Sequence, residues 1–189
     1  MSLDFRPLKP GLMDCLGTVL RGSWGSGCWC MFPRLASAAN QLGSRGRREA
    51  MTRLARRPRA PGLLAFDGEE AVGWIAIAPR KELKRVDASR ATPRVDGVDV
   101  WVIPCITVSP SARGRGIAKA MIKAAVAYAK KHGAPAVEAY PRAGSARTKD
   151  DNAFFGTEPL FRSAGFKVVA GPTMGRLPRV TMRKRCASA

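Results

Sequence analysis

The sequence predicts an α/β (α+β) fold in which a mixed central sheet of roughly six or seven strands is flanked by helices. Three observations predict it. Two apolar runs around residue 70 form a hairpin pattern, the second half of the chain alternates strand-like and helix-like segments, and 189 residues with 46% hydrophobic content suffice for one core. We therefore expect a single domain over residues 1–189.

The first part of the chain predicts a strand, two helices and a loop. Residues 3–8 form a short strand candidate, and residues 11–20 carry apolar residues at helical spacing. Residues 21–34, with the sequence RGSWGSGCWCMFPR, are rich in glycine and aromatic residues and predict a loop. A second helix is expected over residues 48–57, where an apolar stripe faces away from several arginines.

The middle of the chain predicts three strands. Residues 62–67 and 71–79 form a hairpin around a turn that contains Gly68, and a polar connection with helical or turn pieces follows over residues 80–99. The apolar run 100–108 is too short for a helix and therefore predicts a buried strand. Because Pro104 has no backbone N–H to donate, we expect this strand to be unpaired on one side or bulged near Pro104.

From Gly116 the periodicity becomes helical. Apolar residues from Ile117 to Tyr128 share one face, Lys119, Lys123 and Lys130 share the other, and Gly133 ends the helix. The remaining patterns predict a strand, a short helix and two further strands, at residues 135–141, 158–165, 166–171 and 179–184.

The charge of the chain is strongly positive. Its 33 basic and 14 acidic side chains give a net charge of +19, which attracts phosphates, acidic polymers or anionic membranes without naming a partner. No apolar window approaches the roughly 18 residues of a membrane span, and the first ten residues lack the pattern of a secretory leader. Five irregularly spaced cysteines argue against a disulfide framework. We expect a cytoplasmic protein with reduced thiols and no membrane partner.

The stretch SPSARGRGIAKA lies between the buried strand and the long helix. The glycines of its RGRG turn allow close approach of a ligand to the backbone, and the first N–H groups of a helix are free donors with partial positive charge. This placement predicts a diphosphate site, with Arg113 and Arg115 at its rim. A basic patch for nucleic acid is the alternative interpretation. Neither GxxxxGK[ST] nor a dinucleotide-binding GxGxxG motif is present.

The same stretch resembles the acetyl-CoA signature of the GNAT N-acetyltransferase superfamily, [RQ]xxGx[GA], through Arg113, Gly116 and Ala118. The order of strands and helices over about residues 62–184 also resembles this family, which leaves residues 1–61 as an N-terminal strand, helices and an acceptor-side loop. The resemblance implies the GNAT fold, with its sheet splayed at the acetyl-CoA site. Cys28, Trp29 and Cys30 further resemble a CWC element found in a bacterial subgroup.

The resemblance implies a binding mode for acetyl-CoA as cosubstrate. The pantetheine arm would lie against the strand at Ile106, Thr107 and Val108, in a gap opened toward the following strand. The pyrophosphate would be held by the turn and the helix start, at Arg113, Gly114, Arg115, Gly116, Ile117 and Ala118. The implied activity is transfer of the acetyl group to a primary amine of an unidentified small molecule or peptide, by direct attack in a ternary complex.

The catalytic residues of the family are not all present. Phe161 stands where its usual tyrosine acid would be, and Phe154 stands in place of an asparagine. Alternation along residues 135–141 puts Glu138 and Tyr140 on one face, so Glu138 is a candidate base and Tyr140 a candidate acid or substrate contact. A strand end that faces solvent would explain both without chemistry.

The CWC loop has two interpretations. Trp24, Trp29 and Phe32 could wall an acceptor pocket or simply pack. Two cysteines one residue apart, without a second ligand pair, do not make a zinc motif, so we predict no metal.

Two other functions remain open from the sequence. One is a nucleic-acid-binding protein, which the absence of a known recognition motif disfavours. The other is a CoA-binding regulatory module without catalysis, which the missing tyrosine keeps open. The sequence also leaves open whether the protein forms a homodimer.

Overall fold

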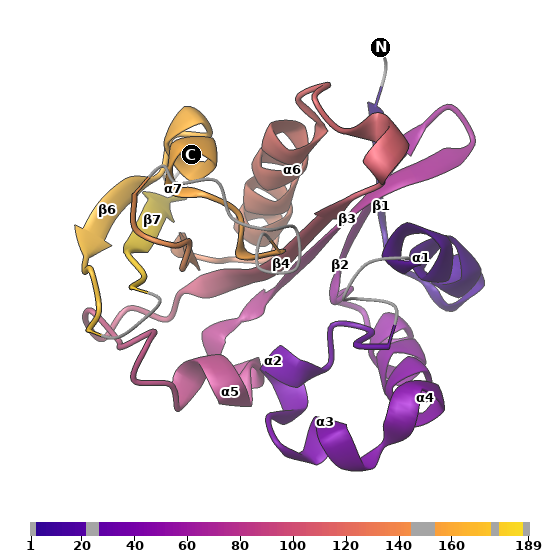
Figure 1. The fold of residues 1–189 in the computed structure, drawn as a ribbon, viewed down its shortest axis with the longest axis horizontal. Coiled ribbons are helices and arrows are strands. Elements are labelled where there is room, and N and C mark those ends of the chain that lie inside the picture. Colours follow the sequence, from indigo (N-terminus) through magenta and orange to yellow (C-terminus); the bar gives the residue numbers. More distant parts are fainter. Residues whose placement is uncertain (1–2, 22–26, 145–153, 175–177, 187–189) are drawn as a thin grey trace.

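A computed structural model describes residues 3–21, 27–144, 154–174 and 178–186 of the chain. Its seven-stranded sheet has the order β1-β2-β3-β4-β5-β7-β6 (Figure 1). The strands are β1 (Leu3–Pro7), β2 (Gly62–Asp67), β3 (Glu70–Pro79), β4 (Trp101–Val108), β5 (Ala136–Ala139), β6 (Lys167–Ala170) and β7 (Thr181–Arg185). The α-helices are α1 (Met13–Leu20), α2 (Phe32–Leu35), α3 (Ala38–Gln41), α4 (Gly43–Ala55), α5 (Lys84–Asp87), α6 (Ile117–Lys131) and α7 (Glu158–Ser163). The mixed α/β architecture predicted from the sequence is confirmed.

The sheet opens between β4 and β5. These strands run parallel and pair only at Trp101 with Val137 and at Val102 with Glu138. Every other neighbouring pair of strands in the sheet is antiparallel. Beyond Val102, the rest of β4 is therefore paired with β3 alone, and its other edge faces the gap that the sequence predicts.

A bulge interrupts β4 where the gap begins. Against β3, Ala78 pairs with Val102 and Ala76 with Cys105, so β4 uses one residue more than β3 over this interval. Pro104 lies inside the interval. A bulge tolerates a residue that cannot donate to the ladder, so Pro104 is accommodated at the point where the two strands separate.

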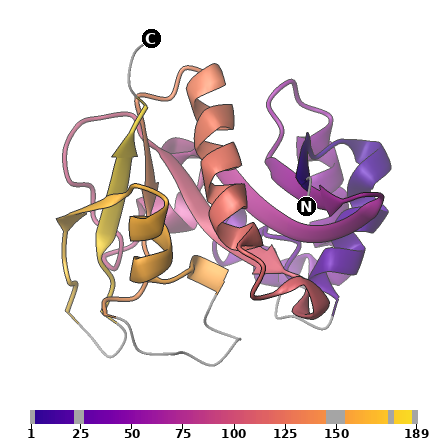
Figure 2. The ribbon, with the colours of Figure 1, turned by 90° about the horizontal axis from the view of Figure 1, so that it is seen from above.

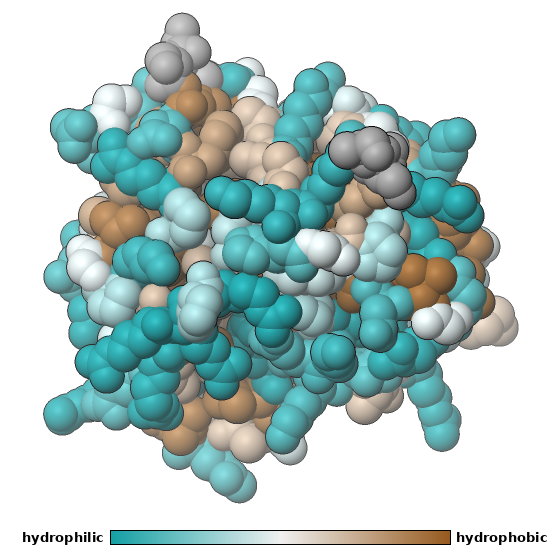
Figure 3. Space-filling model, turned by 180° about the vertical axis from the view of Figure 1, so that it is seen from behind, coloured by the Kyte–Doolittle hydropathy of each residue, from teal (hydrophilic) through white to brown (hydrophobic). Residues whose placement is uncertain are grey.

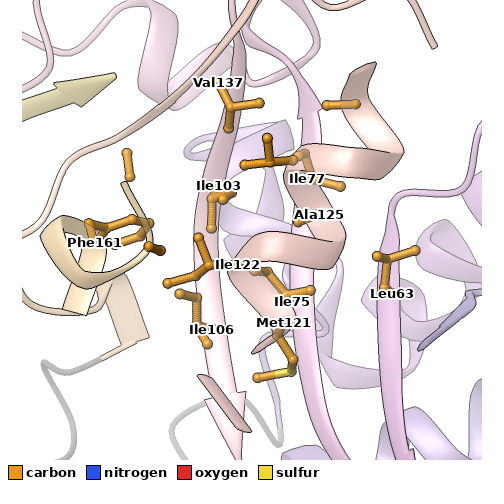
Figure 4. Packing of buried hydrophobic residues seen from close by; sticks show 14 of the residues in the cluster. Leu63, Ile75, Ile77, Ile103, Ile106, Met121, Ile122, Ala125, Val137 and Phe161 are labelled. Carbon is orange, nitrogen blue, oxygen red and sulfur yellow. The ribbon is translucent and has the colours of Figure 1, made fainter. Parts of the chain in front are cut away.

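Helices cover both faces of the sheet. Figure 2 shows α6 lying across its middle, with the C-terminal strands and α7 on one side and the N-terminal helices on the other. In Figure 4, Met121, Ile122 and Ala125 of α6 meet Ile75 of β3 and Ile103 of β4. A second cluster joins α1 and α4 to the opposite face around the fully buried Trp74. Because both faces of β3 and β4 are buried, these strands are apolar along nearly their whole length.

Helix α4 begins earlier than predicted. We expected residues 48–57, and the helix runs from Gly43 to Ala55. The residues in its first turn have a weak helix propensity, so contacts with other parts of the fold are needed to hold this turn. Ser44 Oγ accepts a hydrogen bond from the Trp29 indole at 3.2 Å. Arg47 donates to the carbonyl oxygen of Ala39 at 2.8 Å. Packing thus outweighs local propensity at this end.

The rear face of the molecule is predominantly polar. The face in Figure 3 is mostly hydrophilic, with separate smaller apolar areas. Within the described part of the chain, no helix has both the length and the apolar character to cross a membrane.

Candidate functional site

The turn before α6 is open and exposed. Gly114 and Gly116 adopt left-handed backbone angles, with φ of 76° and 75°, where a side chain would be strained. A Cβ at either position would meet no atom within 4 Å, so the space over the turn is free in the described structure. Among the described residues, no side chain caps the first turn of α6, while buried Ile117 fixes the helix against the core. The backbone donors of this helix start are thus directed to an accessible surface.

The two arginines of the turn make contacts that hold it. The Arg115 guanidinium pairs with the Asp67 carboxylate at 2.6 Å, which ties the turn to the end of β2. Arg113 Nε donates to the carbonyl oxygen of Val108 at 3.4 Å. Both side chains remain partly exposed, so their charge adds to the positive potential of the helix start.

The edge of β4 beside this turn is lined with backbone donors. The N–H of Ser109 donates to the carbonyl of Val72 on β3, at 2.9 Å. Because N–H groups alternate between the two sides of a strand, those of Val108 and Ile106 point away from β3 and toward the gap, whereas that of Thr107 points toward β3. Of the three residues predicted for the pantetheine arm, Ile106 and Val108 therefore have N–H groups directed into the gap.

Glu138 and Tyr140 share one face of the β5 segment, as predicted, but neither faces open solvent. Glu138 is 1% exposed and Tyr140 3% exposed. The interpretation of a solvent-facing strand end is wrong, because residues 80–96 and β7 bring charged side chains over this face.

A buried ion network surrounds the Glu138 carboxylate. Its Oε1 accepts hydrogen bonds from Arg183 Nε at 2.8 Å and Nη2 at 2.6 Å. Its Oε2 accepts one from the Tyr140 hydroxyl at 2.6 Å and lies 3.7 Å from Arg80 Nη1. Arg80 and Arg183 are secured further by Asp87 and Asp96. Sequence reasoning missed both arginines, since no local pattern links them to β5.

The network also changes the acidity of Tyr140. Burial and the adjacent Glu138 carboxylate raise the pKa of the Tyr140 hydroxyl far above its usual range. A hydroxyl with so high a pKa holds its proton firmly, and the carboxylate beside it has both oxygens engaged. The roles of Glu138 as base and Tyr140 as acid stay predictions, with a structural ion network as the competing account.

The two phenylalanines at the altered family positions are packed. Phe161 is fully buried and stacks edge to face on Phe166, with ring centroids 5.1 Å apart. Phe154 is partly buried against the cluster that contains Cys105. Neither residue can donate a proton.

The CWC loop packs against α1, α4 and β3. Trp29 is 9% exposed, and its indole ring leaves little room at Gly17 of α1, where an added Cβ would lie 3.2 Å from it. Trp74 donates its indole N–H to Cys30 Sγ at 3.1 Å. Arg47 lies over the ring of partly exposed Phe32, 5.3 Å from its centroid. Packing is sufficient to explain the position of Trp29. The proposed roles of Trp29 and Phe32 as walls of an acceptor pocket stay predictions. Trp24 lies outside the described residues.

The described residues contain no cluster of three or more histidine, cysteine or carboxylate side chains that could hold a metal ion.

Comparisons with known proteins agree with this geometry. The family model described as "Acetyltransferase (GNAT) family" matches residues 30–149. Among functionally curated proteins, none matches the sequence.

Solved acetyltransferase structures share the fold. An acetyltransferase from Thermus thermophilus is 16% identical, with a TM-score of 0.57 and coverage of 98% of this chain and 97% of that one. The PaiA N-acetyltransferase from Thermoplasma acidophilum, solved with coenzyme A, is 17% identical, with a TM-score of 0.58 and coverage of 98% and 99%. YncA from Salmonella typhimurium, a putative acetyltransferase solved with acetyl-CoA, is 14% identical, with a TM-score of 0.56 and coverage of 100% and 96%.

These structural likenesses establish the fold, and the family model covers more than half of the chain with the splayed strands and the glycine turn inside its range. The chain therefore belongs to the GNAT family of acetyltransferases.

Proposed function

We propose that the protein transfers the acetyl group of acetyl-CoA to a primary amine within a ternary complex. One observation carries the proposal: the uncapped start of α6, with its open glycine turn, lies at the end of the strand whose free edge faces the gap. A diphosphate fits the first feature and an extended amide-containing arm fits the second. Coenzyme A contains both groups.

The described residues supply binding and polarisation. Main-chain donors of Gly114 to Ala118 would hold the pyrophosphate, with the positive end of α6 directed at it. The N–H groups of Ile106 and Val108, which point into the gap, would donate to the pantetheine amides and to the thioester carbonyl oxygen as charge develops there.

The chemical step is direct attack. The neutral amine nitrogen forms a bond with the thioester carbon, the carbon–sulfur bond breaks, coenzyme A leaves as a thiolate, and the nitrogen releases one proton to water to give the amide. Because a thiol pKa near 8.5 makes that thiolate a fair leaving group, it can take its proton from water without a dedicated acid. Phe161, at the position of the usual acid, is consistent with this route.

The first test is acetyl-CoA binding to Gly116→Glu. A glutamate at this position adds a negative charge and a side chain in the open space over the helix start. We expect the affinity for acetyl-CoA to fall at least about tenfold in calorimetry.

Gly133→Glu is the matched control. Gly133 has φ of 80°, equally open surroundings, and a place at the opposite end of α6. The same substitution there should leave affinity unchanged. If the wild type shows no binding up to about 100 µM acetyl-CoA, or if both variants bind like the wild type, the acetyl-CoA site is refuted.

The second test is turnover. A thiol-release assay on a broad panel of amines should show acetyl-CoA consumption that depends on the amine and is lost in Gly116→Glu.

A CoA-binding module without catalysis is the second candidate function. The packed Phe161 favours it, since the usual acid is replaced by a residue that only fills the core. Tight CoA binding without turnover of any amine would decide for this alternative.

The five cysteines are free thiols, which suits a reducing compartment, and we propose a cytoplasmic location.

A further inference from the structure

Two arginines lie opposite each other at the end of the gap. Arg142 follows β5 and Arg179 precedes β7, and the two residues form an antiparallel bridge. Both side chains are partly buried. Like charges placed directly opposite each other are destabilising, so this arrangement needs a compensating interaction.

Within the described residues, the contacts of these two arginines supply no negative charge. Arg179 Nη1 donates to the carbonyl oxygen of Tyr140 at 2.8 Å, and its guanidinium carbon lies 3.6 Å from the ring centroid of Phe155. Arg142 Nε is buried without a hydrogen-bond partner. Burial and the neighbouring Arg142 charge lower the pKa of Arg179 to about 10.

Three arginines elsewhere in the described chain, whose side chains are at most 9% exposed, each lie near a carboxylate. Arg80 pairs with Asp87 and Glu138, Arg183 pairs with Asp96 and Glu138, and Arg34 lies 3.8 Å from Glu82. Within the described residues, no carboxylate lies within ion-pair distance of Arg142 or Arg179. Because burying a cation without a counter-charge is costly, the pair lacks an anion that the other sites possess.

The point where β4 and β5 separate shows that the arginine pair lies near the proposed reaction site. Val102 and Glu138 form the last pair between β4 and β5. Arg142 lies four residues beyond Glu138, as Ile106 lies four residues beyond Val102. Arg142 therefore lies beyond the end of β5, on the other side of the gap from Ile106 and the proposed thioester region.

Two aromatic residues connect the pair to the opposite side of β4. Phe155, under the Arg179 guanidinium, stacks on Phe154 with ring centroids 4.0 Å apart. Phe154 packs against the cluster that joins β4 to α1 and α4. The arginines are therefore joined through packed side chains to the face of the sheet on which the N-terminal helices lie.

We propose that Arg142 and Arg179 bind a carboxylate of the acceptor, so that the substrate is an amine that also carries a carboxylate group. This inference rests on the proposed acetyl transfer and names its substrate class. Two adjacent guanidinium groups offer several N–H donors in planar forks, which match a carboxylate well. An α-amino acid or a compound built like one presents both the nucleophilic nitrogen and the required anion.

The test compares acids with their amides. In a thiol-release assay, L-amino acids and the corresponding carboxamides have the same side chain and nearly the same size, and only the acids carry a negative charge on the recognised group. We expect kcat/KM for the preferred amino acid to exceed that of its carboxamide by about tenfold or more, mainly through KM. In Arg142→Gln this ratio should fall to near one, whereas Arg142→Lys should keep part of it because it keeps the charge.

Stability distinguishes binding from a structural role. Removing one of two unpaired like charges should leave the melting temperature of Arg142→Gln equal to or above that of the wild type. Its affinity for acetyl-CoA should also be unchanged. Arg85→Gln, at an exposed position on α5, is the control for loss of one positive charge and should keep the wild-type ratio.

A binding measurement tests the carboxylate site without requiring the enzyme to turn over a substrate. In the presence of coenzyme A, N-acetyl-L-phenylalanine should bind about tenfold or more tightly than its carboxamide, and Arg142→Gln should remove the difference. Equal affinity for acid and amide, or a preference that survives in Arg142→Gln, overturns the carboxylate site. If no amine is acetylated, acetyl transfer fails and this binding comparison alone decides the carboxylate site.

Discussion

For Glu138, distant partners in the fold decide whether the carboxylate is catalytic or structural. Alternation along β5 correctly puts Glu138 and Tyr140 on one face. The partner of Glu138, Arg183, lies 45 residues away along the chain and hydrogen-bonds both Glu138 and Asp96. Period-2 spacing carries no information on such distant partners. For the same reason, the sequence pattern could not predict that Arg142 and Arg179 lie opposite each other. Their pairing depends on how the segments beyond β5 and before β7 meet.

Glu138→Gln tests whether the carboxylate is structural. The substitution keeps the size of the side chain and removes the charge that Arg80 and Arg183 share. Because breaking one partner of a buried ion pair leaves a charge uncompensated, we expect the free energy of unfolding to fall by about 3 kcal/mol in denaturant titration.

The kinetics of the same variant test the catalytic role. At a temperature where Glu138→Gln remains folded, we expect kcat/KM within a few-fold of the wild type and an unchanged pH profile. A variant of full stability that loses activity a hundredfold or more would instead establish Glu138 as the base.

At the level of elements, the strand–turn–helix unit was predictable because its signals are local. Pro104 predicts a break in pairing, and β4 is bulged there. The glycines predict a turn open to a ligand, and both have positive φ with free space around them. The start of α4 was not predictable, because a contact of Ser44 with Trp29, 15 residues away, sets it.

Hydrogen exchange tests which elements hold acetyl-CoA. If the main chain of β4 and α6 is the binding surface, acetyl-CoA should slow amide exchange at residues 106, 108 and 114–118, since their N–H groups become hydrogen-bonded. Amides of α4, on the other side of the second cluster, should exchange at unchanged rates. Protection confined to α4, or absent from both segments at saturating acetyl-CoA, would contradict this assignment.

At the scale of the whole molecule, the charge of +19 is unevenly compensated. Several carboxylates are held by arginines, among them Asp96 by Arg183 and Glu158 by Arg162. Hydrogen bonds from these arginines lower the pKa of both carboxyl groups. Most other cations are exposed and repel one another, so the folded state depends on a small number of negative charges.

Acid and low salt should therefore destabilise the protein together. A carboxyl group whose folded pKa is depressed contributes stability that is present above its unfolded pKa, near 4, and lost as the pH falls through the lower folded value. We expect the melting temperature to drop as the pH is lowered from about 5 to 3, because Asp96 and Glu158 become protonated while their arginines keep their charge.

At pH 7, raising NaCl from about 20 to 200 mM should increase the melting temperature, because the shorter Debye length screens the excess of cations. Scanning calorimetry over this grid checks both effects. A melting temperature that stays constant down to pH 3, or that falls with NaCl at pH 7, would show that repulsion among the basic side chains does not limit the stability of this fold.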